Sequence, residues 1–377
     1  MTRVLVYIDD LFTKGGGERV AMYFLKSLLE KRIDVYFLAL TDVNTFEEIN
    51  NYYQKNREKF VKGWLFSRLL YVIPKKNKII SMALDYLFLF SMYIHLFFIN
   101  RKIRPDMFIV IANTIYQNVP FIFHKKRIFS WGLTPFTKKW VLFFHNIILR
   151  LGLKKGLLTL VVGSKQQKQM SDREYKSYIS VIPIGYDDIL FNYSGEKKIR
   201  NRIAYVARIS PEKRVDLAVE AARLLKERYR DFQVVIIGDS QNRRYYEEIK
   251  KKITKYKLSS YVKMIPKSSP AIIKKNLLEA EVFWNFSEGY GGVVNCEALA
   301  CGCIPVVFKN FKDQIGDNGY AVNNLEEAVE ATIKILEMNE KDRRKLALKC
   351  SRYAKKYSRS IFEKKLIKLV LHKLQES

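Results

Sequence analysis

Two glutamates bracket a glycine-rich stretch late in the sequence. Residues 287–302 read SEGYGGVVNCEALACG, and Glu288 and Glu297 are separated by eight residues that include three glycines. A carboxylate accepts hydrogen bonds at both oxygens, and sugar or ribose hydroxyls are donors. Glycine lets backbone N–H groups come close to a ligand. The pattern predicts a site for a hydroxyl-rich ligand, while Glu297 alone would also fit compensation of a helix dipole in a first turn.

Two cations precede this stretch in the segment RISPEKRVD, residues 208–216. Arg208 stands at the end of an expected strand, and Lys213 follows five residues later, near the start of an expected helix. Arginine binds phosphate through a two-pronged guanidinium, and a helix N-terminus adds backbone donors. The segment therefore predicts a phosphate site. In so basic a chain the alternative is a solvated surface pair.

A second glycine loop, KGGGER, lies near the N-terminus and contains Gly15, Gly16 and Gly17. It is neither the dinucleotide-binding pattern G-x-G-x-x-G nor a P-loop, because the required spacing and the Gly-Lys-Ser/Thr ending are missing. We expect either a close approach of backbone N–H groups to a ligand or a plain tight turn.

The elements around these residues predict two α/β domains. Residues 4–8 and 33–40 are apolar strands joined by the glycine loop and a helix with apolar residues at helical spacing, which is a βαβ unit. The pattern restarts with strands at 202–208 and 232–239. We expect a cleft between the carboxyl ends of the strands of two such sheets. In the second sheet, Asn295 is the expected N-cap of the helix that carries Glu297.

The length of the chain limits the number of domains, and its net charge limits the kinds of partner. A chain of 377 residues predicts two domains, and the polar stretch 193–202 is the best boundary. We therefore expect domains at 1–190 and 200–352, with 353–377 as a helix that packs back toward the first domain. The net charge of +29 suits nucleotides, nucleic acid or acidic lipid headgroups, or simply serves solubility.

The cysteines and the N-terminal residues indicate the cellular compartment of the protein. The four cysteines match no zinc pattern, so we interpret them as reduced cytosolic thiols. MTRVLVYIDD lacks the apolar core of a signal peptide. The most apolar stretch, 79–99, is interrupted only by Asp85 and His95. We expect a helix that covers the sheet; a helix lying on a membrane surface and a true span are the alternatives.

Taken together, these segments resemble the glycosyltransferase family 4 group of retaining enzymes, which have the GT-B fold. The resemblance covers nearly the whole chain and is carried by several segments in the family's order: GGGERV (15–20), the IRPD element (103–111), VVGSKQQKQM (161–170), IPIGYD (182–187), VARISPEKRVD (206–216), VVIIGD (234–239), the paired-glutamate segment (287–307) and GDNGYAV (316–322). It implies an α/β fold of two Rossmann-like domains facing across a cleft. The first would bind the acceptor and the second the nucleotide sugar.

The resemblance also implies roles for residues. Arg208 and Lys213 would grip the donor's diphosphate, Glu297 would bind the ribose, and Glu288 would hold the donor sugar as a catalytic residue. Further donor contacts are expected from two loops: Gly15, Gly16 and Gly17, and Gly289, Tyr290, Gly291, Gly292 and Val293. No metal and no cofactor beyond the nucleotide-diphosphate sugar is implied.

Besides Ala207, which stands where the family often has a glycine before the arginine, the chain departs from the family's pattern in two places. The family usually has seven residues between its glutamates, and here there are eight. The family often has a histidine near the end of a strand around 128–133, where this chain reads RIFSWGLTP, with Ser130 and Trp131 nearby. The first departure affects the alignment of Glu288, and the second affects donor preference.

The sequence thus predicts a cytoplasmic, metal-independent, retaining glycosyltransferase of the hexosyltransferase type. Its acceptor would be a saccharide or a lipid-linked saccharide, and it would sit peripherally on the inner face of a membrane with anionic lipid as partner. Two rivals stay open. One is a nucleic-acid-binding or DNA-modifying protein, which the glutamates disfavour because carboxylates repel phosphates. The other is a catalytically inactive GT-B scaffold subunit.

Overall fold

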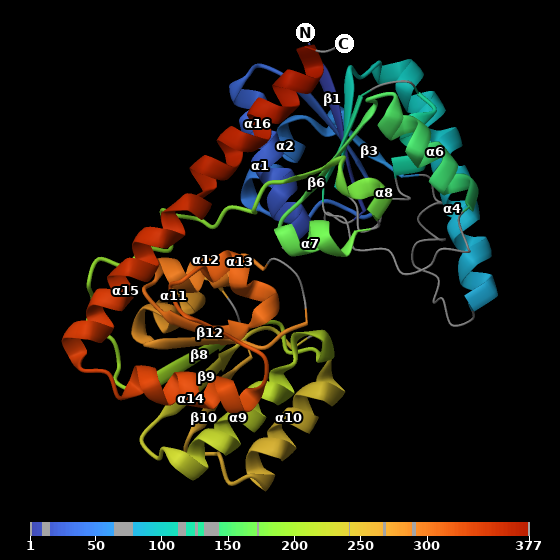
Figure 1. The fold of residues 1–377 in the computed structure, drawn as a ribbon. Coiled ribbons are helices and arrows are strands. Elements are labelled where there is room, and N and C mark those ends of the chain that lie inside the picture. The colour runs from blue at the N-terminus through green and yellow to red at the C-terminus, as the bar shows by residue number, and fades with distance from the viewer. Residues whose placement is uncertain are drawn as a thin grey trace. The chain divides into compact units, whose positions relative to one another are not determined.

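The fold was analysed in a computed structural model of the chain. The structure describes residues 2–9, 16–63, 78–111, 118–124, 127–131, 143–171, 173–240, 242–266, 269–288 and 292–375. The chain divides into two compact units. The first comprises 1–183 with 363–377, and the second comprises 184–362. Figure 1 shows that each unit is a sheet with helices on both of its faces.

The first unit is built on a seven-stranded parallel sheet with the order β3-β2-β1-β4-β5-β6-β7. Its strands are β1 (Arg3–Ile8), β2 (Asp34–Ala39), β3 (Phe60–Lys62), β4 (Met107–Ile111), β5 (Arg127–Trp131), β6 (Leu158–Val162) and β7 (Ile179–Val181). The central strands are apolar along their length because helices cover both faces. The strands expected at 4–8 and 33–40 are confirmed.

Helices cover the two faces of this sheet. They are α1 (Gly16–Glu30), α2 (Glu47–Lys55), η1 (Arg57–Lys59), α4 (Lys78–Ile103), α5 (Val119–Ile122), α6 (Phe143–Lys154), α7 (Lys165–Met170) and α8 (Arg173–Lys176). α4, α5 and α6 share one core with alternate residues of the strands, among them Phe108 and Ile128. α1 packs on the opposite face, where the rings of Phe24 and Phe129 are 5.4 Å apart. The expected sheet-covering helix at 79–99 is therefore confirmed as α4.

The second unit has a six-stranded parallel sheet with the order β10-β9-β8-β11-β12-β13. Its strands are β8 (Arg202–Val206), β9 (Gln233–Ile237), β10 (Val262–Ile265), β11 (Val282–Asn285), β12 (Ile304–Phe308) and β13 (Tyr320–Val322). The strand order reverses between β8 and β11. In open α/β sheets a ligand crevice forms at the carboxyl ends of strands at such a switch point.

The helices of the second unit are η3 (Pro211–Lys213), α9 (Val215–Arg228), α10 (Arg243–Lys255), α11 (Pro270–Glu279), α12 (Val294–Ala300), η4 (Lys309–Phe311), α13 (Lys312–Ile315), α14 (Leu325–Leu336), α15 (Glu340–Ala354) and η5 (Lys355–Tyr357). α9, α10 and α14 cover one face, and α11, α12 and α15 cover the other (Figure 1). Trp284 of β11 is fully buried, and its indole donates to Thr332 of α14 at 2.9 Å. One continuous apolar core fills both layers.

The last helix, α16 (Arg359–Gln375), belongs to both units: its first residues lie in the second unit, and from Glu363 onward it belongs to the first. Gly185 allows the start of this helix to come close, since a Cβ there would lie 2.8 Å from the Cα of Arg359. Over the described residues, no helix combines the length and the hydrophobicity needed to cross a bilayer.

Candidate donor-binding site

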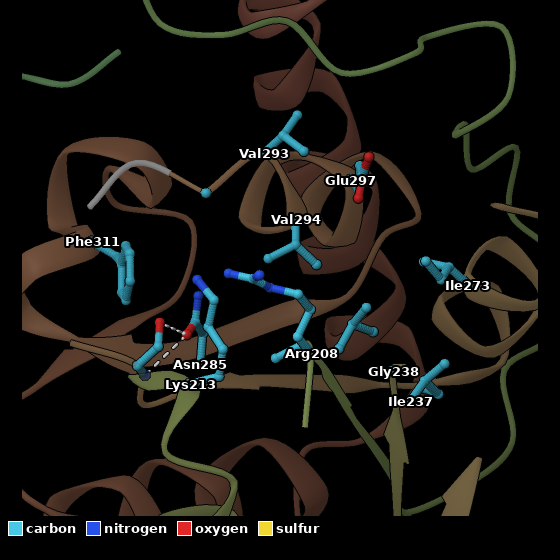
Figure 2. A pocket seen from close by; sticks show the side chains of 14 residues that line it. Arg208, Lys213, Ile237, Gly238, Ile273, Asn285, Val293, Val294, Glu297 and Phe311 are labelled. Atoms are coloured by element: carbon cyan, nitrogen blue, oxygen red, sulfur yellow. Dashed lines mark hydrogen bonds between the residues drawn. The ribbon is translucent and has the colours of Figure 1, made fainter. Parts of the chain in front are cut away.

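A pocket of about 260 Å³ opens at the switch point of the second sheet. Its walls come from the ends of β8, β9 and β11, from α11 and α12, and from η4 (Figure 2). The polar and charged side chains among the lining residues are Arg208, Lys213, Asn285, Ser287 and Glu297. The apolar part is formed mainly by Ile237, Ile273, Val293, Val294 and Phe311. The pocket therefore offers two cations, one carboxylate and an apolar wall within one crevice.

Gly238 fixes how closely two sides of the pocket approach each other. A Cβ at this position would lie 1.7 Å from the carbonyl oxygen of Ala207, so no other residue fits without moving the backbone. Ala207 directly precedes Arg208. The glycine at the end of β9 therefore determines where the arginine enters the pocket.

Arg208 and Lys213 line this pocket together, from the loop that follows β8 and from η3. The buried Tyr205 holds the segment from below, because its hydroxyl donates to the carbonyl oxygen of Lys213 at 2.6 Å. Burial lowers the pKa of Lys213 from its ordinary value of 10.5, and the charge of Arg208 lowers it further. A bound anion would reverse this effect, so the pair is suited to an anionic ligand.

The guanidinium of Arg208 also lies 3.5 Å from the carboxylate of Glu212. Both side chains are about half exposed, and an ion pair of this kind contributes little stability. Exchange of this contact for a phosphate oxygen would therefore cost little.

Glu297 lies in the first turn of α12 and is buried, with 4% of its surface exposed. The expectation that Asn295 caps this helix is wrong. α12 begins at Val294 with Val293 at the cap position, and Asn295 lies inside the helix. Its side-chain oxygen accepts from Asn285 at 2.8 Å, and its amide donates to Gln314. Asn295 instead ties α12 to β11 and α13, which fixes the helix that carries Glu297.

Glu288 is not among the residues that line the pocket. Its carboxylate is 69% exposed and accepts a hydrogen bond from Arg214. Arg214 has a left-handed backbone, with φ 48°, and also contacts Asp216 at 3.3 Å. Asp216 in turn accepts from the hydroxyl of Tyr245 at 2.8 Å. Glu288 thus anchors the start of the glycine loop to the residue that follows Lys213.

The remaining predicted contacts are distributed between the two units. Gly292 and Val293 line the pocket. Gly289, Tyr290 and Gly291 lie outside the described residues, as does Gly15. Gly16 and Gly17 form the first residues of α1 in the first unit. In that unit Ser130 and Trp131, which occupy the region of the family's histidine, are buried at the end of β5.

Sequence reasoning missed two polar lining residues, Asn285 and Ser287. The backbone N–H and the hydroxyl of Ser287 both donate to the side-chain oxygen of Asn285, at 3.1 and 2.8 Å. A signal was present, because an asparagine interrupts the apolar run VFWNF at a strand's carboxyl end. That edge is the one that carries Arg208.

The comparisons with known proteins agree with this geometry. Residues 187–357, nearly the whole second unit, match the model of the family described as Glycosyl transferases group 1. No curated protein is significantly similar to the chain in sequence.

Solved structures share the fold over the full length. A glycosyltransferase from Rickettsia africae is 15% identical, with a TM-score of 0.73 over 100% of this chain and 99% of that one. Sucrose-phosphate synthase from Thermosynechococcus elongatus is 13% identical, with a TM-score of 0.74 over 100% of both chains. HepE from Anabaena, solved in complex with UDP, is 12% identical, with a TM-score of 0.71 over 99% of this chain and 100% of that one. The chain has the GT-B fold of two Rossmann-like domains, and residues 187–357 of its second unit match the family model described as Glycosyl transferases group 1.

Proposed function

We propose that the protein is a retaining glycosyltransferase that moves a hexosyl group from a nucleoside diphosphate sugar to a saccharide or a lipid-linked saccharide. The observation that carries this proposal is the gathering of Arg208, Lys213 and Glu297 around one pocket of the unit that matches the family. Phosphate, ribose and base need cations, a hydroxyl acceptor and an apolar wall, respectively, and this pocket supplies all three.

Arg208 and Lys213 bind the diphosphate in this proposal. When the bond between the anomeric carbon and the diphosphate breaks, negative charge builds on the leaving phosphate oxygen. Cations already in position stabilise that charge without reorganisation, which is commonly the largest electrostatic contribution to such a reaction. The two side chains supply this charge themselves, so we propose a metal-independent reaction, which activity in the presence of a chelator would test.

Glu297 accepts hydrogen bonds from the ribose hydroxyls. Its burial removes competing water, and the Asn285–Asn295–Gln314 contacts hold its helix in place. A buried carboxylate that accepts from hydroxyls discriminates strongly against a ligand that lacks them, since its own hydrogen bonds are then lost. The apolar wall formed by Ile237 and Ile273 suits the base.

Gly292 and Val293 take the donor sugar, and the acceptor hydroxyl attacks the anomeric carbon from the side that the nucleotide leaves. The donor contacts of Gly15, Gly16, Gly17, Gly289, Tyr290 and Gly291 stay predictions. Glu288 acts through its contact with Arg214, which positions the loop. Because HepE was solved with UDP and with UDP-glucose, we choose UDP-glucose as the first donor to test.

A cytoplasmic location is proposed from the four cysteines, which are free and buried. Burial raises the pKa of the Cys303 thiol to about 11 and that of Cys350 to about 12, which keeps both protonated and unreactive. Free thiols fit a reducing compartment.

The test is a screen of nucleoside diphosphates and their sugars by thermal shift, followed by turnover of the stabilising donor. A ligand at about 100 times its dissociation constant stabilises its site by about 2.7 kcal/mol. We expect stabilisation by one nucleoside diphosphate and slow hydrolysis or transfer of its sugar. Binding without turnover on any donor and acceptor would instead favour an inactive scaffold.

A further inference from the structure

The first unit exposes large apolar side chains along one region of its surface. We call this region the α4–α6 apolar surface, and it comprises Leu87, Phe90, Phe97 and Phe98 of α4, Phe123 just after α5, and Leu151 of α6. Phe90 is 62% exposed and Phe98 56%. Soluble proteins rarely leave several aromatic side chains together in water without a binding partner.

The geometry of α4 explains why these residues lie together. Met92, Leu96, Ile99 and Ile103 face the core of the first unit. With 3.6 residues per turn, Leu87, Phe90, Phe97 and Phe98 fall on the opposite side of the same helix. α4 is therefore apolar on its outer face as well as its inner one. A helix of this kind needs a second apolar environment besides its own core.

The surface continues from α4 to its neighbours. The rings of Tyr93 and Phe123 pack edge to face, with centroids 5.2 Å apart. α5 contacts both α4 and α6, and all three helices contribute to the same core. Figure 1 shows α4 and α6 on the same side of the first sheet. The exposed side chains of α4 therefore adjoin Phe123, and Leu151 lies on the helix that packs against α5.

The charge of this part of the chain is strongly one-sided. Residues 78–170, from the start of α4 to the end of α7, contain fourteen lysines and arginines and two acidic residues, Asp85 and Asp106. The guanidinium of Arg101 lies over the ring of Phe97, 4.9 Å from its centroid, so cation and aromatic ring share one face. Lys154, the last residue of α6, and Lys155, which follows it, are both exposed. The partner must therefore offer both an apolar interior and negative charge.

We infer that the α4–α6 apolar surface docks on a bilayer that contains anionic lipid. Aromatic and leucine side chains enter the boundary between headgroups and acyl chains, while arginine and lysine contact lipid phosphates. This chemistry is that of an interfacial helix, which lies in the plane of the membrane. The inference does not rest on the proposed function, because it uses no residue of the donor pocket.

The test is flotation of the full chain with vesicles of phosphatidylcholine and phosphatidylglycerol in about equal parts, compared with pure phosphatidylcholine. We expect binding to the anionic vesicles. The double change Phe90→Ser and Phe98→Ser should lower the partition coefficient at least about tenfold, since two large side chains no longer leave water. The matched control is Ile189→Ser, because Ile189 is 85% exposed but lies in the second unit. It should bind like the wild type.

A second variant guards against loss of folding in the double change. Arg101→Gln leaves the apolar residues intact and should weaken binding to the anionic vesicles about fivefold, with little change on pure phosphatidylcholine. Absence of wild-type binding at moderate salt overturns the inference, and so does binding that Phe90→Ser with Phe98→Ser leaves unchanged in folded protein. Light scattering measures the oligomeric state and tests whether a second copy of the chain covers the surface. A wild-type dimer that the double change dissociates, with no vesicle binding, would assign the surface to a second copy and overturn the lipid proposal.

Discussion

The two units have the same kind of sheet but differ in their surfaces: the first exposes many large apolar side chains, and the second has a pocket lined by charged residues. Both are parallel sheets covered by helices, and both have strand orders that reverse near the centre. Of the twelve exposed large apolar side chains in the described part of the chain, ten lie in the first unit, and only Ile189 and Ile199 lie in the second. The second unit instead carries the pocket with two cations and a buried glutamate.

The comparison shows that the same α/β arrangement has its distinctive residues in different places in the two units: in loops at strand ends in one, and on a helix face in the other. In the second unit, the proposed donor site lies at the carboxyl ends of strands, where loops bring polar side chains to the switch point. In the first unit, the distinctive feature is the outer face of a helix. Changes in one unit should therefore leave the property of the other unit intact.

The largest effect is expected for Arg208→Ala. Loss of a preorganised charge at the leaving group should lower kcat/KM about 100-fold to 1,000-fold. Vesicle binding should stay at the wild-type level, because the change does not touch the first unit. The matched control is Arg230→Ala, an exposed arginine of the same unit that does not line the pocket. If both variants lose the same activity, general surface charge rather than the pocket is responsible.

The next prediction compares the free energies of unfolding of Gly238→Ala and Gly292→Ala. Both glycines line the pocket, but a Cβ at Gly238 would lie 1.7 Å from the oxygen of Ala207, whereas at Gly292 the nearest atom would be 3.7 Å away. We expect Gly238→Ala to lower the free energy of unfolding by about 1–3 kcal/mol and to weaken nucleotide binding. Gly292→Ala should be close to the wild type in unfolding. Equal stability of the two variants in denaturant titrations would show that the close approach of Gly238 to Ala207 does not fix the position of Arg208.

A pH dependence follows from Lys213. Its pKa is lowered by burial and then by the charge of Arg208, so the free enzyme loses this proton at a lower pH than an ordinary lysine does. The charged form binds diphosphate, and therefore kcat/KM should fall by about tenfold per pH unit once the pH exceeds that pKa.

The variant Lys213→Arg distinguishes deprotonation of Lys213 from a general loss of activity at alkaline pH. Arginine stays protonated, so the alkaline fall should move to higher pH even if the maximal rate is lower. A pH–rate profile that is the same in both proteins would assign the fall to another group.

The smallest effect is expected for Glu288→Gln. Its contact with Arg214 is largely exposed, so its loss should cost at most about 1 kcal/mol, or roughly fivefold in donor affinity. Arg214→Ala should have a larger effect, because it also removes the contact with Asp216, and adding Glu288→Gln to that variant should change donor affinity little further. A loss of 100-fold or more for Glu288→Gln alone would show that Glu288 contacts the donor sugar directly, as the family resemblance implies.

Sequence patterns predicted the elements of both sheets well, because buried parallel strands are short apolar runs and their helices have a regular period. They also singled out Arg208, Lys213 and Glu297, and the family resemblance added Gly292 and Val293; the structure brings all five to one pocket. These residues lie in the segments that follow β8 and β11, and the carboxyl ends of neighbouring parallel strands meet at one edge of the sheet.

Other features depend on contacts between segments far apart in the sequence. Asn295 has the composition of an N-cap, yet its side chain bonds to Asn285 and Gln314, which are 10 and 19 residues away. The contact of Glu288 with Arg214 spans 74 residues and depends on a left-handed backbone at a non-glycine residue. Local propensity contains no information about either contact.

The most direct test of the donor pocket is a calorimetric titration with the best-binding nucleoside diphosphate and with its free nucleoside. Wild type, Arg208→Ala and Glu297→Gln would be compared, all as full chains. We predict that Arg208→Ala weakens the diphosphate about tenfold or more but leaves the nucleoside unchanged, whereas Glu297→Gln weakens both ligands. Unchanged affinity of both variants for the diphosphate would contradict the assignment of this pocket to the donor.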